Sequence, residues 1–120
     1  MSSAIIIRTT NEIEVVDYPK ENGYEFLREI VGGFIEGIDF NLAGMRCNGY
    51  INEEGKLENL TSNPIATTIS WAQESIQPWD YIAGNLVIVR RGRGDSERGF
   101  TDAEIKDVLA YFSTLFAIEA

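Results

Sequence analysis

The chain has 120 residues, of which 44% are hydrophobic, so it can bury the core of one domain without disulfides or metal ions. Its formal net charge of −9 disfavours binding to nucleic acid or to an anionic membrane, because both are negatively charged. Histidine is absent and Cys47 is the single cysteine, which excludes an intramolecular disulfide and leaves little for zinc coordination or general acid–base catalysis.

A hairpin and a helix are predicted at the start of the chain. β-branched and alternating residues predict strands over 4–9 and 12–18, joined by a short turn. Apolar residues at helical spacing predict a helix over 24–31. Gly32-Gly33 ends this helix, because glycine readily adopts the left-handed conformation of a helix C-cap.

A second hairpin and a second helix are predicted next. The alternating segments 34–40 and 45–52 indicate two strands, and a short strand near 57–60 is expected after the turn signal at 52–56. Asn63-Pro64 begins a helix, since Asn is a favourable N-cap and Pro suits the first helical position. This helix ends by Gln73 and is expected to place Trp71 in the core.

The last third of the chain contains its most apolar segment. A strand over 82–90 is predicted to lie in the centre of the sheet, because residues 86–89 are continuously apolar. A glycine-interrupted loop covers 91–99, and Thr101 and Glu104 form a capping box for a final helix that runs to about residue 117. The predicted core stripe of this helix is Ile105, Val108, Leu109, Phe112, Leu115 and Phe116.

Strands outnumber helices in this succession, and most connections are short. The sequence therefore predicts a single α+β domain over residues 1–120, with a mainly antiparallel sheet of about five or six strands and three helices. No segment approaches the length of a membrane span, and the first residues do not resemble a secretory signal, so we expect a cytoplasmic protein without a membrane partner. The apolar residues of the last helix, Tyr111, Phe112, Leu115, Phe116 and Ile118, predict a homo-oligomer interface.

An arginine-rich loop is the sharpest chemical feature. Four of the seven arginines, Arg90, Arg91, Arg93 and Arg98, lie within nine residues of an acidic protein. The guanidinium group matches phosphate with two parallel hydrogen bonds, and the interleaved glycines allow a ligand to approach the backbone. The alternative is a solvated loop whose arginines pair with Asp95, Glu97 and Asp102. Strand alternation places Arg90 and Arg91 on opposite faces, which argues against both pointing into one pocket.

Two further segments are candidate parts of a ligand site. The helix start at Asn63 to Thr67 offers unpaired amides and the positive end of a helix dipole, although an ordinary capped helix explains the same residues. Trp79 lies in a loop beside Pro78, so Trp79 or Tyr81 is the predicted surface for stacking on a base.

Four short motifs give the chain a resemblance to a known group of proteins. They are EIVGGFIE at 29–36, NEEGK at 52–56, NPIA at 63–66 and DYIAGN at 80–85. In this order they resemble a family of small uncharacterised domains that bacteriophages and mobile elements carry. The resemblance implies a role against host defence in the bacterial cytoplasm, related in kind to the Thoeris anti-defence proteins that sequester cyclic ADP-ribose isomers.

Two specific functions remain open at this point, beside a third interpretation as a plain structural or interaction module that binds no small ligand. In the first, the protein binds a small phosphate-bearing nucleotide signal through Arg90, Arg91, Arg93 and Arg98 and does not cleave it, without a cofactor or a metal. In the second, the acidic protein mimics DNA or inhibits a host restriction or defence protein through its surface. The clustered arginines favour the first function, because a DNA mimic gains nothing from them. Direct binding to nucleic acid is not expected.

Overall fold

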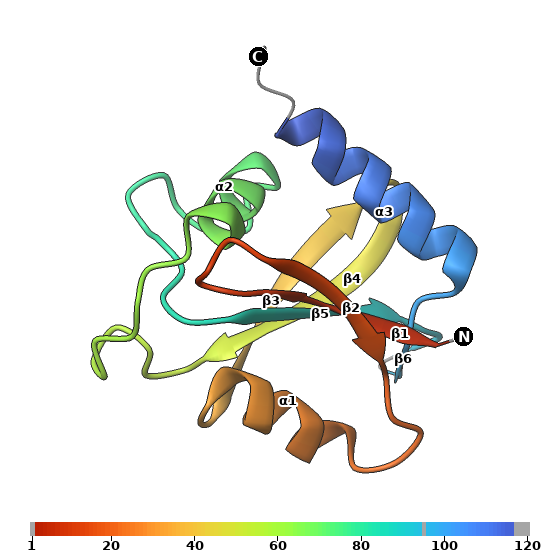
Figure 1. Cartoon of the computed structure of the whole chain (residues 1–120), viewed down its shortest axis with the longest axis horizontal. Coiled ribbons are helices and arrows are strands. Elements are labelled where there is room, and N and C mark those ends of the chain that lie inside the picture. Colours follow the sequence, from red (N-terminus) through yellow and green to blue (C-terminus); the bar gives the residue numbers. More distant parts are fainter. Residues whose placement is uncertain (1, 95, 117–120) are drawn as a thin grey trace.

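The computed structural model describes residues 2–94 and 96–116, which form one β-sheet with helices on both sides (Figure 1). The elements in chain order are β1 (Ser3–Ile7), β2 (Ile13–Asp17), α1 (Gly23–Val31), β3 (Ile35–Leu42), β4 (Met45–Asn52), α2 (Pro64–Ala72), β5 (Leu86–Arg91), β6 (Glu97–Arg98) and α3 (Asp102–Leu115). All strand pairings among them are antiparallel. The predicted α+β class with three helices and an antiparallel sheet, here of six strands, is confirmed.

The strand β5 lies at the centre of the sheet, as its apolar sequence predicts. The strand order is β2-β1-β5-β4-β3, and β6 pairs with the end of β5. One edge of β5 is shared by two partners, since Leu86 lies opposite Ile7 of β1 whereas Arg90 lies opposite Arg98 of β6. The other edge pairs with β4. The apolar half of β5 is therefore enclosed, and its arginine-bearing end extends into the β5–β6 hairpin.

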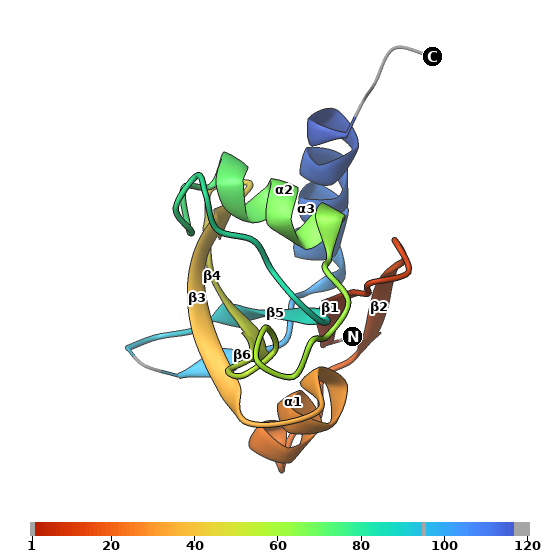
Figure 2. The same cartoon turned by 90° about the vertical axis from the view of Figure 1, so that its left-hand side faces the viewer.

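Two helices cover one face of the sheet and the third covers the other (Figure 2). Alternate residues of β5 enter the two cores, because successive side chains of a strand point to opposite faces. Leu86 and Ile88 pack in the core that includes residues of α2 and α3, and Val87 and Val89 pack in the core that includes residues of α1. Burial on both faces explains why this segment is continuously apolar.

The strands β3 and β4 form a longer hairpin than the sequence pattern predicts. β3 continues to Leu42, which pairs with Met45, so the connection shortens to Ala43 and Gly44. Both connecting residues have positive φ, 52° for Ala43 and 80° for Gly44. A two-residue turn of this kind matches the right-handed twist of the flanking strands, and it brings the hairpin tip beside the end of β5.

Three sequence predictions about local structure are wrong. No strand forms at 57–60; these residues follow a series of turns in which the Leu60 amide donates to the Gly55 carbonyl, and Leu57 is 83% exposed. The central strand begins at Leu86 instead of 82, because residue 83 makes an isolated bridge with Ser62 and Gly84 has a φ of 87°.

The third wrong prediction concerns Trp71, which is 46% exposed rather than buried in the core. It lies on the outer side of α2, and its indole Nε1 donates a 2.9 Å hydrogen bond to the Asp80 carbonyl. No helix within the described residues is long and apolar enough to cross a bilayer.

Candidate functional site

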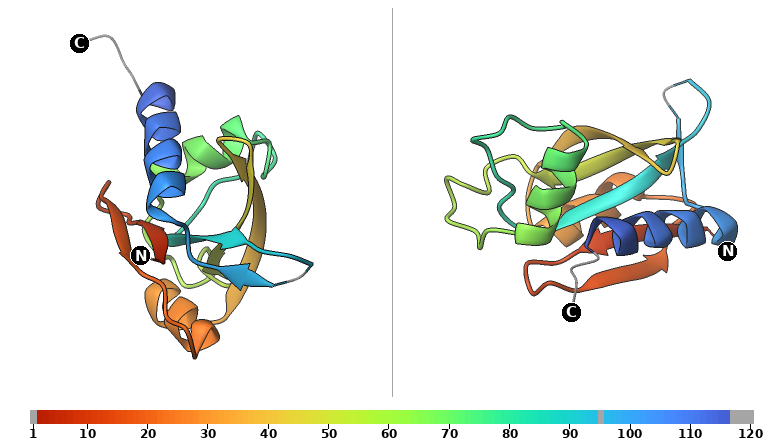
Figure 3. Two further views of the ribbon diagram at one scale, coloured as in Figure 1. Left: turned by 90° about the vertical axis from the view of Figure 1, so that its right-hand side faces the viewer. Right: turned by 90° about the horizontal axis from the view of Figure 1, so that it is seen from above.

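Two hairpin tips enclose a basic cleft at the end of β5. The tips are the β3–β4 turn and the β5–β6 loop, which projects from the body of the molecule (Figure 3). The cleft has a volume of about 530 Å³, and its lining consists of three glycines and five arginines: Gly44, Arg46, Arg90, Arg91, Gly92, Arg93, Gly94 and Arg98. We call it the arginine cleft. None of the described residues that line it is acidic, although the chain carries a net charge of −9.

The β5–β6 loop has a defined turn on its outer side. The Gly92 amide donates to the Ser96 carbonyl at 2.9 Å, and the Ser96 amide donates to the Arg93 carbonyl at 3.1 Å. A side chain at residue 92 would place its Cβ 2.7 Å from Ser96 Oγ, and Gly94 has a φ of 60°. A side chain at 92 would therefore force the Ser96 hydroxyl to move, and the positive φ at 94 favours glycine. Asp95 lies outside the described residues.

Glu104 orients two of the arginines from the start of α3. Arg98 donates to both carboxylate oxygens, from Nη1 at 2.8 Å and from Nη2 at 2.9 Å, and Arg90 Nε donates at 3.2 Å. The Thr101 amide donates to the same carboxylate, which completes the predicted capping box. Hydrogen bonding from Arg98, followed by the Thr101 amide and Arg90, lowers the pKa of Glu104 to about 2. The carboxylate stays ionised and fixes both guanidinium groups.

Arg91 is held on the opposite face of the sheet. Its Nε donates to Asn48 Oδ1 at 3.0 Å, and its Nη2 donates to Asp39 Oδ1 at 2.9 Å. The guanidinium groups of Arg90 and Arg91 thus bond on different faces, as the alternation predicts. Both residues nevertheless line the same cleft, together with Gly44 and Arg46 of the β3–β4 hairpin.

Arg46 and Arg93 complete the lining of the cleft. Within residues 2–94 and 96–116, neither guanidinium group has a hydrogen-bond or ion-pair partner, and both side chains are exposed. Sequence reasoning misses Arg46, which lies far from the loop in the chain. The strand register places it there, since Cys47 pairs with Arg90 and the Arg46 carbonyl accepts a 2.9 Å bond from Arg90 Nη1.

The alternative interpretation of the loop pairs its arginines with Glu97, and the structure shows no such pair among the described residues. Glu97 instead accepts hydrogen bonds from Asn48 Nδ2 and from the Tyr50 hydroxyl. Burial, together with the hydrogen bond to Glu97, raises the pKa of Tyr50. Two acidic residues outside the loop, Asp39 and Glu104, form ion pairs with Arg91 and Arg98.

The predicted second anchor at the start of α2 lies in the interior, away from the arginine cleft. Asn63 is fully buried, its Nδ2 donates to the carbonyls of Ile7 and Gly84, and its Oδ1 accepts from the Ala66 amide. Thr67 is also buried, and its hydroxyl accepts from the Ile82 amide. Their polar atoms connect α2 to β1 and to the segment before β5, so we assign them a structural role and leave them out of the site.

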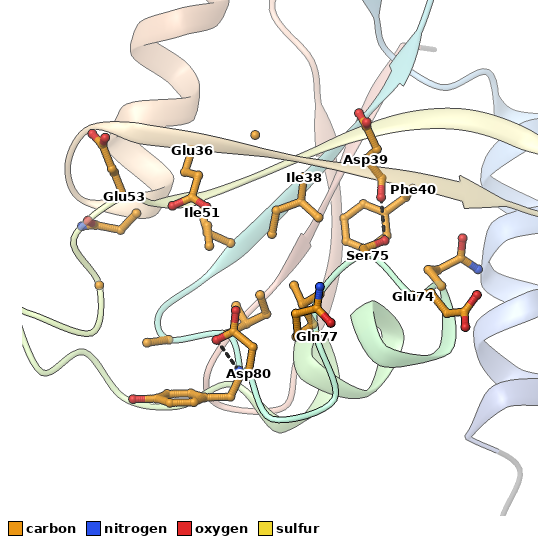
Figure 4. Close-up of a pocket in the computed structure, with 18 of the residues that line it drawn as sticks. Glu36, Ile38, Asp39, Phe40, Ile51, Glu53, Glu74, Ser75, Gln77 and Asp80 are labelled. Carbon is orange, nitrogen blue, oxygen red and sulfur yellow. Dashed lines mark hydrogen bonds between the residues drawn. The ribbon is translucent and has the colours of Figure 1, made fainter.

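The predicted stacking residues do not line the arginine cleft either. Trp79 is 81% exposed, as expected for a loop, and the ammonium group of Lys56 lies 4.7 Å from the ring centroid of Tyr81. Tyr81 lines a larger cleft of about 1070 Å³ between the β3–β4 hairpin and residues 73–83 (Figure 4). We call this the acidic cleft, because its lining includes Glu36, Asp39, Glu53, Glu74 and Asp80. Arg46 and Arg91 line both clefts.

The chemistry available in the arginine cleft is recognition of an anion. Guanidinium groups are fork-shaped donors that remain protonated, and the glycines add backbone groups without side-chain bulk. Among the described residues, no group of three or more His, Cys, Asp or Glu side chains could hold a metal ion.

Comparison with known proteins places the chain in a family. No curated protein and no solved structure matches it. One family model does, over nearly the whole length of the chain, and its description is that of a domain of unknown function. The resemblance seen in the sequence motifs is thus confirmed in its coarser part, a family of uncharacterised domains. With residues 1–113 matched, the chain belongs to the family described as Domain of unknown function (DUF3846).

Proposed function

We propose that the arginine cleft binds a phosphate-bearing ligand of the nucleotide class. The observation that carries the proposal is the convergence of five arginines from two hairpins on one cleft of about 530 Å³. This volume falls within the range of small-molecule sites, about 300–1,000 Å³. Arg90, Arg91 and Arg98 are already oriented by carboxylates, which lowers the entropy lost when a ligand binds.

The proposal includes binding without turnover. The described residues that line the cleft are arginine and glycine, and arginine cannot accept a proton at neutral pH. Cys47 is buried, and the loss of solvent raises its pKa to about 11, so its thiol is a poor nucleophile. A phosphate held by these residues would be retained without a general base to activate an attacking group.

We extend the proposal to the biological role that the sequence motifs imply. A protein that binds a nucleotide and leaves it intact lowers the free concentration of that nucleotide. In a protein carried by a bacteriophage or mobile element, the ligand would be a nucleotide-derived immune signal, such as a cyclic ADP-ribose isomer or a cyclic nucleotide. Lysate from cells with triggered defence signalling should then yield a small molecule that co-purifies and is identified by mass spectrometry after denaturation.

Calorimetry with defined probes tests the binding site directly. Pyrophosphate and ADP-ribose should bind, and ribose should not, because the cleft recognises negative charge. Arg46→Ala and Arg93→Ala should each weaken binding roughly ten- to a hundredfold, since a hydrogen bond to a charged group contributes about 1.5–3 kcal/mol. Neither replacement breaks an ion pair within the described part of the chain, so both variants should keep the parent's thermal midpoint.

Lys20→Ala is the matched control, because Lys20 is an exposed cation in the connection between β2 and α1. It should bind both probes like the parent. If the two arginine variants also bind like the parent, the cleft is not the site. Recovery of a chemically altered ADP-ribose after incubation would contradict binding without turnover.

A further inference from the structure

The strand β3 is an edge of the sheet with part of its backbone unpaired. It pairs with β4 alone, and the Phe34 carbonyl accepts from the Glu53 amide just before the strand. Backbone groups of successive residues in an antiparallel strand point to alternate sides. Even-numbered residues of β3 therefore bond to β4, whereas the N–H and C=O groups of Ile35, Gly37, Asp39 and Asn41 point outward.

Within residues 2–94 and 96–116, hydrogen bonds from other segments cover one end of this edge. The Asn41 amide donates to Gln73 Oε1 at 2.9 Å, and the Asp39 carbonyl accepts from Ser75 Oγ at 2.6 Å. Among the described residues, nothing bonds to the outward backbone groups of Gly37, which is exposed. The open stretch from Ile35 to Asp39 offers hydrogen bonds to one added strand.

The acidic cleft lies beside this open stretch. In Figure 4, Glu36, Ile38 and Phe40 point from β3 toward the segment that carries Ser75, Gln77 and Asp80. In a strand added at this edge, the residues opposite Glu36 and Ile38 would point their side chains to the same face of the sheet as Glu36 and Ile38 do. The cleft thus combines an apolar floor with carboxylates. Glu36, Glu53 and Glu74 have no side-chain partner within the described part of the chain.

We propose that the open stretch of β3 binds an extended basic peptide segment of a partner protein, which adds one strand to the sheet. The aliphatic part of a lysine or arginine would pack on Ile38 and Phe40, and its charged end would reach Glu36. Electrostatic repulsion disfavours binding of a second copy of the chain at this edge. Two copies joined along β3 would bring their unpaired carboxylates together in a protein that carries a net charge of −9.

Gly37 allows a matched pair of variants. Its outward N–H is not part of the pairing with β4, so Gly37→Pro removes the donor without removing a hydrogen bond of the sheet. Gly37→Ala keeps the donor, and its added Cβ would lie 3.6 Å from the Tyr50 ring, an ordinary contact distance. The probe is a short fluorescein-labelled peptide that alternates arginine with threonine, read by fluorescence polarisation at physiological ionic strength.

The parent should bind this peptide with saturation, and Gly37→Ala should bind within about twofold of the parent. Gly37→Pro should weaken binding by about tenfold, because it loses a hydrogen bond and obstructs the added strand. Glu36→Gln should also weaken binding. A peptide of equal charge with prolines for threonines, and a peptide with glutamates for arginines, should both bind more weakly than the probe.

Hydrogen exchange gives a second readout that does not depend on the proline variant. Addition of the probe should slow exchange of the Gly37 and Asp39 amides in the parent protein. Unchanged exchange, equal affinity of parent and Gly37→Pro, or equal binding of the proline-containing peptide would each overturn the proposal. A parent dimer that Gly37→Pro dissociates would overturn it in favour of self-association.

This inference does not rest on the function proposed for the arginine cleft. Arg93→Ala should bind the peptide like the parent, because Arg93 does not line the acidic cleft. Gly37→Pro should likewise bind pyrophosphate like the parent. Failure of one proposal is therefore distinguishable from failure of the other.

Discussion

At the scale of single residues, Glu104 connects helix formation with the geometry of the arginine cleft. Its carboxylate caps α3 through the Thr101 amide and holds Arg90 and Arg98 through three further hydrogen bonds. A charged group with this many donors is stabilised in the ionised form. The same side chain therefore stabilises a helix start and preorganises two donors for an anion.

The stability of the protein should depend on this ionisation. Folding lowers the pKa of Glu104 from an ordinary 4.5 to about 2, chiefly through Arg98, so its contribution is present above pH 4.5 and is lost as the pH falls toward 2. Glu104→Gln should lower the free energy of unfolding by roughly 2 kcal/mol at neutral pH. Urea unfolding at several pH values should show this difference shrinking between pH 4.5 and 2.

Arg98→Ala serves as the companion variant, because its guanidinium group is the first cause of the lowered pKa. In that background, Glu104→Gln should produce a smaller loss and a weaker dependence on pH. A difference between parent and Glu104→Gln that stays constant down to pH 2 would contradict the assignment.

Asn63 should contribute to stability and not to ligand binding. Asn63→Ala removes the N-cap of α2 and leaves the carbonyls of Ile7 and Gly84 without their side-chain donor. We expect a loss of about 2–4 kcal/mol in the free energy of unfolding, from the cap and from buried groups left unpaired. The folded fraction should bind pyrophosphate with the parent's affinity; a selective loss of affinity would restore Asn63 to the site.

At the scale of elements, β5 carries buried core residues at its start and cleft-lining residues at its end. Its first four residues are buried between two layers of helices, and its last two reach the arginine cleft. The β3–β4 turn and the start of α3 approach the same end of β5 and supply Arg46 and Glu104. Residues of two hairpins therefore line the cleft at one end of the central strand, and the start of α3 orients two of its arginines.

The capping box of α3 should be measurable against a matched threonine. Thr101 Oγ1 accepts from the Glu104 amide at 3.2 Å, whereas Thr114 Oγ1 only donates to the Ala110 carbonyl within the last turns of the helix. Thr101→Ala should destabilise the protein by about 1 kcal/mol in urea unfolding. Thr114→Ala, at an exposed position, should change stability by no more than about 0.5 kcal/mol. Equal effects would show that the cap contributes nothing specific.

At the scale of the whole molecule, charge is segregated into two clefts of opposite character. Five arginines line one cleft, while carboxylates predominate along the larger one, and Arg46 and Arg91 lie where the two meet. The ion pair between Arg91 and Asp39 lies at this junction. A net charge of −9 therefore does not describe the local field that a ligand meets.

Self-association through α3 stays a prediction. Tyr111, Leu115 and Phe116 are partly buried and pack against the main core, which uses much of the apolar surface that the sequence assigns to an interface; Ile118 lies outside the described residues. Light scattering over a wide concentration range should show a mass above that of the monomer. Added salt should favour association, because it screens the repulsion between acidic copies. A monomer mass throughout would contradict the prediction.

Features that depend on neighbouring residues are predictable from the sequence. The caps at Asn63 and Thr101, the helix stop at Gly32 and the continuous apolar run of β5 all operate within a few residues, and each lies where the pattern predicts. The fold class follows from the order of these elements. The arginine loop is equally local, so its four arginines could be named in advance.

Tertiary structure alone decided which distant residues meet. Arg46 joins the loop arginines through strand register, and Glu104 and Asp39, which lie outside the loop, orient Arg90, Arg98 and Arg91. Packing also decided that Asn63, a predicted ligand residue, is buried and hydrogen-bonded to other segments. It likewise left Trp71, a predicted core residue, exposed. Cross-strand contacts and the burial of a helix face depend on elements that lie far apart in the chain. The local pattern of residues does not show which of these elements pack together.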